Sequence, residues 1–340
     1  MKTCLMCRKN TIEHYGICEE CAELNRNMRN MPCDFSEKTA VVTGGRIKIG
    51  YAVCLRLLRN GAKVIAVTRY PKTAMEQYAK EPDFEQFKDR LFIIGFDLLR
   101  VDLIEDLLLQ IQEIAENKVD ILINNAAQTV KKSNDYYATL IAHENKLLLE
   151  SNHHLILRHN PNDTVNALIP FNSICDYGET PLENSWVRKA ENISVKEMLE
   201  VQLINVTAPF LLTSCIRKMM LHNPSENKFI INVSSVEGRF QTKQKLARHV
   251  HTNMAKASLN MMTHSVASDF AKDNIYVYSC DPGWVSNQFP PEYEISKNFQ
   301  PYLTFQDGAC RILYPIVKNS GESKIIDFGK FYKDYQIIDY

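Results

Sequence analysis

Four cysteines near the start of the chain have the spacing of metal ligands. They form two pairs, Cys4-x2-Cys7 and Cys18-x2-Cys21, and Gly16 precedes the second pair. A Cys-x2-Cys pair can fold into a tight knuckle that points both sulfurs at one ion, and two knuckles supply the four-sulfur shell that structural Zn²⁺ prefers. Because so short a segment buries little core of its own, we expect a metal to stabilise it.

Disulfides and unrelated buried thiols are the other interpretations of these cysteines. A reducing compartment disfavours disulfides, and two pairs at ligand spacing seldom arise by chance, so zinc is favoured. Cys33 could replace a ligand but is interpreted as a separate thiol. A closed four-cysteine site leaves no open position for chemistry, which indicates docking to the main body or to a partner protein. Nucleic-acid binding is disfavoured because the charges of residues 1–33 nearly balance.

A glycine-rich turn further along has the composition of a phosphate-binding site. A β-branched run at residues 39–43 predicts a buried strand, and residues 44–50 (GGRIKIG) follow it. A helical pattern then covers residues 51–60, Gly61 ends it, and residues 63–68 predict a second strand. Strand, glycine turn, helix and strand form the dinucleotide-binding unit, in which the pyrophosphate binds the helix N-terminus.

Further motifs follow this unit in order along the chain. Asp97-Leu98 ends a strand predicted at 91–96, and NNAA (124–127) follows one predicted at 120–123. Asn205 lies in the segment LINVTAPF, and the segment INVSS ends at Ser235. Asp281-Pro282-Gly283 follows a later predicted strand. Together with the turn, these motifs resemble those of the short-chain dehydrogenase/reductase family over about residues 36–290. Lys48 occupies the place of the middle glycine in that family's first turn.

The resemblance implies a Rossmann-type, doubly wound parallel sheet and hydride transfer between a nicotinamide and a carbonyl or alcohol carbon. It assigns Ser235 to orient the substrate oxygen, Lys256 to hold the nicotinamide ribose and Asn205 to a water relay. It also implies a homo-oligomer. The residues expected to contact the cofactor are Thr43, Gly44, Arg46, Lys48, Ile49, Gly50, Arg69, Asp97, Leu98, Asn125, Ala126, Lys256, Pro282 and Gly283.

The family's tyrosine, four residues before the lysine, is replaced by Thr252. A neighbouring ammonium makes tyrosine useful as an acid near neutral pH, whereas a threonine hydroxyl is not acidic enough and is shorter. Three explanations stay open: His251 or His249 supplies the proton, a tyrosine such as Tyr177 folds over the site, or the site binds nucleotide without standard carbonyl reduction. We retain Thr252 and His251 as candidate catalytic residues. The sequence HTNMAKA and the tail motif KDY at 333–335 resemble a subgroup that carries the same change.

The charge at the end of the second strand favours NADP(H) over NAD(H). A family member that prefers NAD presents a carboxylate here, but this chain has Thr68-Arg69. Arg69 suits a 2′-phosphate, and Arg46 and Lys48 add positive charge nearby. The alternative is that all three are solvated surface charges. Lys48 could either neutralise the pyrophosphate or crowd it.

An insertion at about residues 131–191 separates the NNAA motif from Asn205. It contains an amphipathic helical pattern at 135–151, and it leaves the sheet at the edge where open α/β folds bind ligands, so we expect a lid or an oligomer contact. A basic loop at 239–248 without acidic residues also borders this edge, and Lys131-Lys132 lie near it. The loop suits an anionic substrate, or it is an ordinary solvated loop.

Composition limits the remaining function classes. The 340 residues carry 40 basic and 40 acidic side chains, which disfavours nucleic-acid binding, and no apolar run reaches membrane-spanning length. Without a signal-peptide pattern, we expect a cytoplasmic protein. The chain divides into a head with its linker (1–33) and a Rossmann domain (34–340). The polar stretch that forms the linker covers about residues 25–36. We expect an NADP(H)-dependent oxidoreductase for a carbonyl or alcohol; the alternative is an NADP(H)-binding sensor or scaffold that recruits partners through its head.

Overall fold

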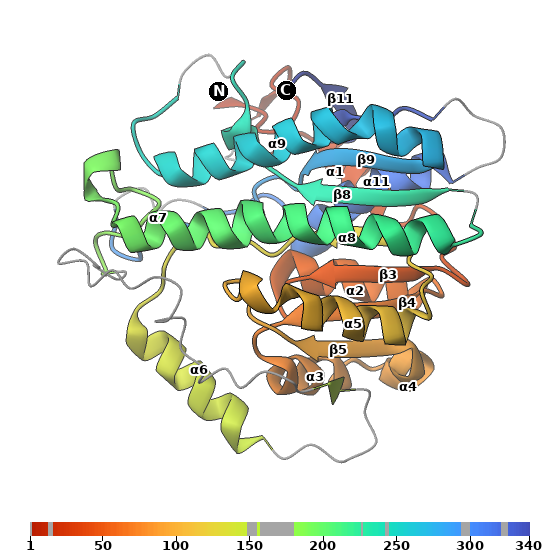
Figure 1. Cartoon of the computed structure of the whole chain (residues 1–340). Helices are drawn as coiled ribbons and strands as arrows, with labels where there is room; N and C mark the ends of the chain where they lie inside the picture. Colours follow the sequence, from red (N-terminus) through yellow and green to blue (C-terminus); the bar gives the residue numbers. More distant parts are fainter. Residues whose placement is uncertain are drawn as a thin grey trace.

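The computed structural model describes residues 2–12, 16–147, 155–156, 180–225, 227–241, 245–293, 300–320 and 326–340. Its centre is a nine-stranded sheet, parallel except for its last strand pair (Figure 1). In spatial order the strands are β11 (Gln336–Ile338), β10 (Lys330–Lys333), β9 (Ile275–Asp281), β8 (Lys228–Val233), β6 (Ile121–Asn124), β3 (Thr39–Thr43), β4 (Lys63–Thr68), β5 (Leu91–Gly95) and β7 (Leu155–Ile156). The strand order reverses between β3 and β6, which confirms the predicted doubly wound fold.

Helices cover both faces of this sheet because successive strand residues point to opposite sides. In β3, Ala40 and Val42 pack on one side, and Val41 packs on the other. The first side is covered by α2 (Lys48–Arg59), α3 (Pro71–Ala79), α4 (Phe84–Phe87) and α11 (Phe305–Asn319). The second side is covered by α5 (Ile104–Ala115), α7 (Val195–Gln202), α8 (Ala208–His222) and α9 (Val250–Phe270).

One helical stretch, Val195–His222, is long and apolar enough to cross a membrane by length and composition. It joins α7 and α8 through a π-helical turn, η5 (Leu203–Thr207). Half of its apolar window is buried, and it packs on the sheet beside α5 and α9 (Figure 1). Its buried apolar side chains, among them Leu212 and Ile216, belong to the core of the domain.

The insertion contributes helix α6 (Asn134–Lys146), which begins one residue before the predicted helix. Glu144 on α6 accepts hydrogen bonds from the backbone N–H groups of Lys72 (2.6 Å) and Thr73 (2.9 Å) at the start of α3. A carboxylate at a helix N-terminus pairs with the unsatisfied donors and the positive end of the dipole. Glu144 thus anchors α6 to the N-terminus of α3. Tyr177 and residues 148–151 lie outside the described residues.

The head folds as a hairpin, β1 (Lys2–Thr3) with β2 (Thr11–Ile12), followed by α1 (Glu19–Arg29). The predicted linker is wrong for residues 25–29, which belong to α1. Polarity misled the prediction, because Asn25 is buried and accepts a hydrogen bond from Arg311 of α11 (2.9 Å). The head shares its apolar cluster with α11 and the chain end, which include Cys310 and Tyr335.

Candidate active site

The glycine turn between β3 and α2 depends on two close backbone approaches. Gly44 has φ +73°, in the left-handed region that favours glycine. A Cβ on Gly50 would lie 2.2 Å from the carbonyl oxygen of Gly44, so only glycine fits. Thr43, just before the turn, accepts hydrogen bonds at Oγ1 from the N–H groups of Asn125 and Ala126, both at 3.0 Å. These contacts fasten the turn to the end of β6.

Lys48 adopts the backbone conformation of the glycine that it replaces. Its φ is +56°, which is unfavourable for a residue with a Cβ. Lys48 is also the first residue of α2, so its side chain starts from the helix N-terminus. A cation here adds to the positive end of the helix dipole at the place expected for the pyrophosphate.

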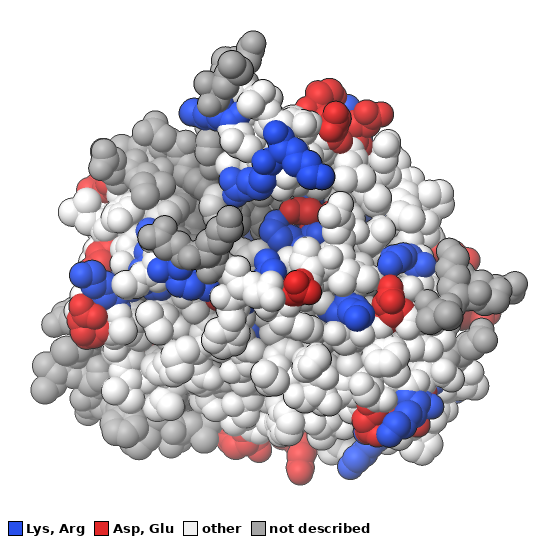
Figure 2. Space-filling view, turned by 90° about the horizontal axis from the view of Figure 1, so that it is seen from above, with Lys and Arg blue, Asp and Glu red and all other residues white. Residues whose placement is uncertain are grey.

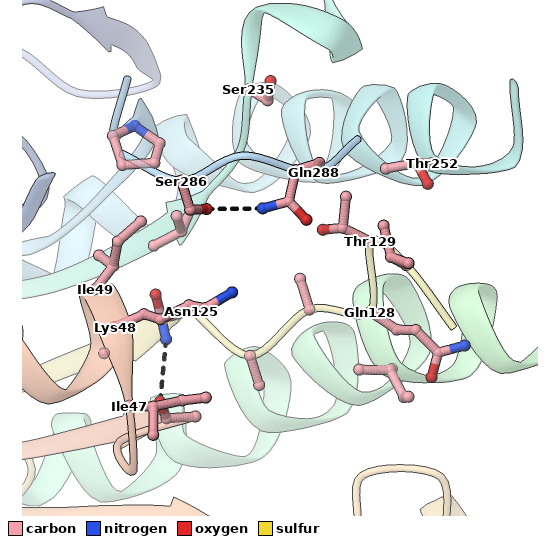
Figure 3. Close-up of a pocket in the computed structure, with 18 of the residues that line it drawn as sticks. Ile47, Lys48, Ile49, Asn125, Gln128, Thr129, Ser235, Thr252, Ser286 and Gln288 are labelled. Carbon is pink, nitrogen blue, oxygen red and sulfur yellow. Dashed lines mark hydrogen bonds between the residues drawn. The ribbon is translucent and has the colours of Figure 1, made fainter. Parts of the chain in front are cut away.

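A cavity of about 630 Å³ opens at the carboxyl ends of the strands. Ser235 and Thr252 lie along one wall, and Asn125, Gln128 and Thr129 lie along the other (Figure 3). This volume is in the range of pockets for small-molecule ligands. The cavity lining includes these residues expected to contact the cofactor: Gly44, Arg46, Lys48, Ile49, Gly50, Arg69, Asp97, Leu98, Asn125, Ala126, Lys256, Pro282 and Gly283.

Two arginines flank one tyrosine at the β4 end of this cavity. The guanidinium carbons of Arg46 and Arg69 lie 5.2 and 5.5 Å from the centre of the Tyr70 ring, and Arg69 is also 5.3 Å from the ring of Tyr137. Within the described part of the chain, neither arginine forms an ion pair with a carboxylate. Both therefore keep their charge available for an anionic ligand group.

The opposite end of the cavity holds Ser235, Thr252 and Lys256. Lys256 is 7% exposed and donates from Nζ to the carbonyl oxygen of Val233 (2.7 Å). Burial lowers the pKa of Lys256 to about 8, although Asp281 opposes the shift. Ser235 Oγ accepts from the N–H of Glu237 (3.1 Å), which leaves its own proton free to donate. Within the described chain, the buried Oγ1 of Thr252 has no hydrogen-bond partner.

A histidine that faces two acceptors lies beside this triplet. His249, also in the cavity lining, places Nδ1 2.8 Å from the carbonyl oxygen of Trp186 and Nε2 3.4 Å from Oε2 of Glu237. Its ring stacks on the Trp186 ring at 4.1 Å. Both ring nitrogens of His249 therefore face oxygen atoms that can accept a hydrogen bond. The hydrogen bond from His249 and the charge of Lys245 lower the pKa of Glu237.

Two of the predicted catalytic residues lie outside the cavity lining. His251 turns away from it, because its Nε2 lies 3.7 Å from Oε1 of buried Glu197. Asn205 lies in the π-turn η5, accepts from the N–H of Gln128 (2.8 Å) and donates to its carbonyl (3.0 Å). Asn205 thus positions the cavity wall at Gln128. Glu237 was not predicted as a site residue. Its position two residues after Ser235 is the feature of the sequence that could have indicated it.

The insertion and the basic loop both border the cavity. Lys132, Tyr136, Tyr137, Leu140 and Trp186 come from the insertion, and Lys245, Leu246 and Arg248 come from the loop. Figure 2 shows Lys and Arg side chains around a recess in the middle of one face of the molecule. These residues of the insertion and of the loop therefore line the cavity.

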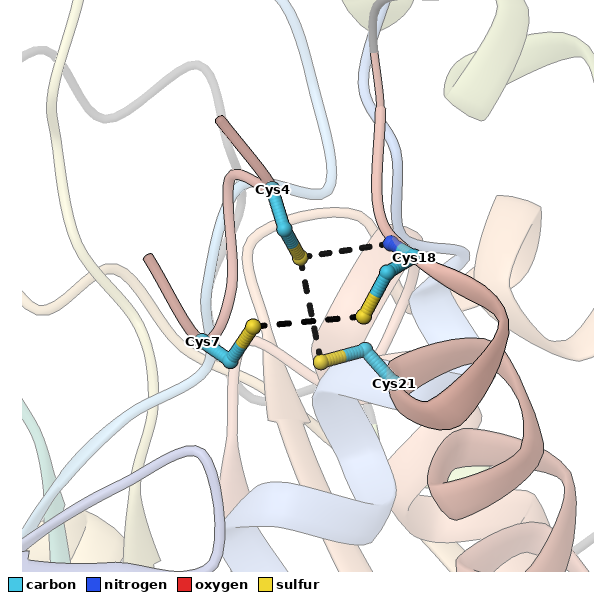
Figure 4. A group of neighbouring side chains, drawn as sticks. All are labelled: Cys4, Cys7, Cys18 and Cys21. Atoms are coloured by element: carbon cyan, nitrogen blue, oxygen red, sulfur yellow. Dashed lines mark hydrogen bonds between the residues drawn. The ribbon is translucent and has the colours of Figure 1, made fainter. Parts of the chain in front are cut away.

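The four head cysteines converge on one point (Figure 4). Cys4 and Cys21 place their sulfurs 3.8 Å apart, Cys7 and Cys18 place theirs 3.9 Å apart, and all four lie within 4.8 Å of one another. A tetrahedron with Zn–S bonds of about 2.3 Å has sulfur–sulfur edges of about 3.8 Å, far longer than a disulfide. Burial opposes ionisation, but N–H groups of Cys18, Cys7 and Met6 outweigh it and lower the pKa of Cys4 to about 6.

Comparison with known proteins agrees with this geometry. The family model for short chain dehydrogenase matches residues 38–143, and the model for enoyl-(acyl carrier protein) reductase matches residues 183–302. The chain belongs to the short-chain dehydrogenase/reductase family, which is a family of oxidoreductases acting on small molecules. The uncharacterized protein R665 of Acanthamoeba polyphaga mimivirus is 31% identical over 360 residues, covering 97% of this chain and 75% of the viral protein.

A second, more distant relative is itself named as a short chain dehydrogenase. The short chain dehydrogenase penD of Penicillium thymicola is 25% identical over 288 residues, covering 81% of this chain and 83% of penD. Among solved structures, a short chain dehydrogenase of Burkholderia cenocepacia in complex with NADP has a TM-score of 0.58 at 17% identity, covering 84% of this chain and 92% of that one. NADPH-bound carbonyl reductase from chicken fatty liver has a TM-score of 0.58 at 19% identity, covering 87% and 96%. These two structures share the fold.

Proposed function

We propose that the protein is an NADP(H)-dependent oxidoreductase that interconverts a carbonyl compound and its alcohol. The observation that carries this proposal is the convergence of Ser235, Thr252 and Lys256 on the cavity that the glycine turn also lines. The bound nicotinamide would supply or accept the hydride at the substrate carbon. The protein must hold the substrate oxygen and move one proton to or from it.

Ser235 and Thr252 are suited to hold the substrate oxygen. The Ser235 hydroxyl already accepts from Glu237 N–H and can donate its proton, and the buried Thr252 hydroxyl has no partner within the described chain. An unsatisfied buried hydroxyl beside a cavity is stabilised when a ligand oxygen pairs with it. Lys256, with one of its three donors on Val233, would use the others on the nicotinamide ribose.

The proton partner that we propose is His249, acting with Thr252. In the reducing direction, when the nicotinamide would supply the hydride to the carbonyl carbon, the protonated ring of His249 would give its proton to the carbonyl oxygen. The Thr252 hydroxyl hydrogen-bonds that oxygen, and Glu237 beside His249 stabilises the cation before transfer. His251 is less suited, because its ring faces Glu197 and not the cavity. This route should make activity depend on His249, so His249→Gln should lower the rate of NADPH-dependent carbonyl reduction.

NADP(H) is proposed over NAD(H) because Arg46 and Arg69 lie at the β4 end of the cavity. Arginine binds phosphate through a planar fork of donors, and a carboxylate that would reject the 2′-phosphate is absent from the end of β4, where Thr68 lies. The NADP-bound chicken and Burkholderia structures share this fold, which is consistent with the proposal.

We propose that the substrate is anionic, because Arg248 lies at the other end of the cavity. The guanidinium carbon of Arg248 lies 5.1 Å from the centre of the Phe289 ring, and both residues line the cavity. Its buried Nε has no hydrogen-bond partner within the described chain. A carboxylate or phosphate on the substrate would satisfy that donor.

We also propose one Zn²⁺ per chain at the four cysteines, in a reducing, cytoplasmic setting, and a homo-oligomeric assembly of the kind the family favours. Metal analysis of protein purified without added metal should give about one zinc per chain. A value far below one would overturn the zinc site. The head already buries one face against α11, so a partner protein would have to bind its remaining surface.

A second candidate function is an NADP(H)-binding sensor or scaffold, which the replacement of tyrosine by Thr252 favours. Titration of NADPH into wild-type protein and Lys256→Ala protein, followed by an NADPH-oxidation screen over aldehydes, ketones and enones, separates the two functions. Lys272→Ala is a matched control, since this lysine is exposed on η7 (Ala271–Asp273). Lys256-dependent binding with turnover supports the enzyme; binding without turnover on any substrate supports the sensor; no binding overturns both.

A further inference from the structure

Arg311 on α11 is the most buried cation at the contact between the head and the Rossmann domain. It is 1% exposed, and all three guanidinium nitrogens have partners. Nε donates to Asp334 (3.0 Å), and Nη1 donates to the carbonyl of Asp307 (3.1 Å) and to the hydroxyl of Tyr335 (3.2 Å). A buried guanidinium needs such partners, because an unpaired buried charge is strongly destabilising.

Among the described residues, the partners of the remaining nitrogen, Nη2, belong to the head. It lies 2.9 Å from Oδ1 of Asn25 and 3.5 Å from Sδ of Met6. Met6 lies between Cys4 and Cys7 in the first knuckle, and Asn25 lies one helical turn after Cys21 in α1. One side of Arg311 is therefore fixed by both halves of the four-cysteine cluster.

The other side of Arg311 faces the turn after β9, which lines the cofactor cavity. A Cβ built on Gly283 would lie 3.6 Å from Arg311 Nε and 2.5 Å from Cδ1 of Leu303, so Arg311 and Leu303 both pack close to this glycine. One turn earlier on α11, a Cβ on Gly308 would lie 3.3 Å from Ile49 and 3.5 Å from the carbonyl oxygen of Pro282. Helix α11 thus packs closely at Gly308 against Ile49 of the glycine turn and against the Pro282–Val285 segment.

We propose that the metal head and the cofactor cavity are energetically coupled through Arg311, so that Zn²⁺ and NADP(H) each tighten the binding of the other. The coupling rests on the proposed NADP(H) function. Without metal, a head this small cannot hold Met6 and Asn25 in place. Nη2 then loses its partners, and α11 loses the contacts that fix its position against the Pro282–Gly283 turn. Arg311 is a positioning residue, and the head regulates the enzyme by controlling cofactor affinity.

Thermodynamic linkage gives this proposal a strict test, because each ligand must change the affinity of the other by the same factor. NADPH affinity is measured by fluorescence titration of zinc-loaded and zinc-stripped protein. Zinc affinity is measured by competition with a chromogenic chelator, with and without saturating NADPH. We expect the two factors to agree at roughly tenfold, within the usual range of allosteric coupling. Adenosine 2′,5′-bisphosphate, which can reach Arg46 and Arg69 but not the Pro282–Gly283 turn, should leave zinc affinity nearly unchanged.

Asn25→Ala removes one head contact of Arg311 and keeps all four cysteines. We expect it to retain one zinc per chain and to lose most of the coupling, whereas Asn27→Ala, the same substitution at an exposed position of α1, should keep it. If NADPH leaves zinc affinity unchanged in the wild-type protein, the coupling is refuted while NADPH binding itself still supports the proposed function. The chelator measurement starts from loaded, folded protein, so it decides the question even if stripped protein unfolds. Failure of loaded protein to bind NADPH would refute the proposed function as well.

Discussion

Lys256 should destabilise the fold that contains it. Its ammonium is almost completely buried, its one hydrogen bond in the described structure goes to the carbonyl of Val233, and burial lowers its pKa from 10.5 to about 8. A lowered lysine pKa means that folding favours the neutral amine. The unfavourable contribution is therefore complete below pH 8, decreases as pH rises toward 10.5, and vanishes above that value.

The size of this effect follows from the shift. At 1.36 kcal/mol for each pKa unit, the charged lysine costs about 3 kcal/mol at pH 7 and under about 1 kcal/mol near pH 10. Lys256→Met removes the charge and also the bond to Val233, whose loss costs about 1 kcal/mol. We expect the variant without cofactor to be more stable than wild type by about 2 kcal/mol at pH 7, with the advantage lost by pH 10.

Urea unfolding of both proteins at several values between pH 7 and pH 10 measures this difference directly. Subtracting one protein from the other removes the contribution of every other titrating group. A difference in unfolding free energy that stays constant across this range would refute the assigned cause, because the ionisation of Lys256 is the difference between the two proteins that depends on pH. A variant less stable than wild type at pH 7 would show that the ammonium has a stabilising partner.

Three further outcomes are expected. Arg69→Gln should weaken NADPH binding roughly 10- to 100-fold, because a charged contact with the 2′-phosphate is lost, and should leave NADH binding nearly unchanged. Calorimetry measures both affinities, and equal losses for the two cofactors would contradict the role of Arg69 in binding the 2′-phosphate. Lys48→Gly should raise the unfolding free energy by about 0.5–1 kcal/mol, because glycine relieves the positive φ, and should weaken NADPH binding by loss of a cation; lower stability would disprove the strain. Thr252→Tyr should raise ketone reduction at least tenfold, since a general acid contributes about 10²–10⁴-fold; unchanged or lower turnover would show that the cavity does not accept the tyrosine.

The sheet and the glycine turn could be predicted because local sequence determines them. The strands at Thr39–Thr43 and Lys63–Thr68 have the predicted bounds, since a short β-branched run followed by glycine or a polar turn leaves little freedom at its ends. The same holds for the residues at the carboxyl ends of the strands, which a parallel sheet brings to one edge. The family comparisons agree with both.

The contacts that join distant segments could not be predicted in this way. Asn25 is polar in a polar run, and only the buried charge of Arg311, far along the chain, explains why it is inside. Helical spacing alone did not distinguish His249 from His251. His249, the residue just before α9, has φ +41° and turns its ring onto Trp186, whereas His251 follows the helix and faces Glu197.

Three unfavourable local features meet at one cavity. Lys48 and His249 have positive φ without being glycine, and Lys256 is a charged residue held at 7% exposure. Each lowers stability, and none is required by the packing of the sheet, whose core is formed by the clusters on its two faces. Strain and unfavourable buried charge at a ligand cavity are retained when the protein uses them, although positive φ also occurs at turns outside this cavity. A scaffold that only presents a surface gains nothing from a buried lysine beside two unsatisfied or half-satisfied hydroxyls. The site therefore favours catalysis over a purely structural role. The replacement of tyrosine by Thr252 then means that another group delivers the proton.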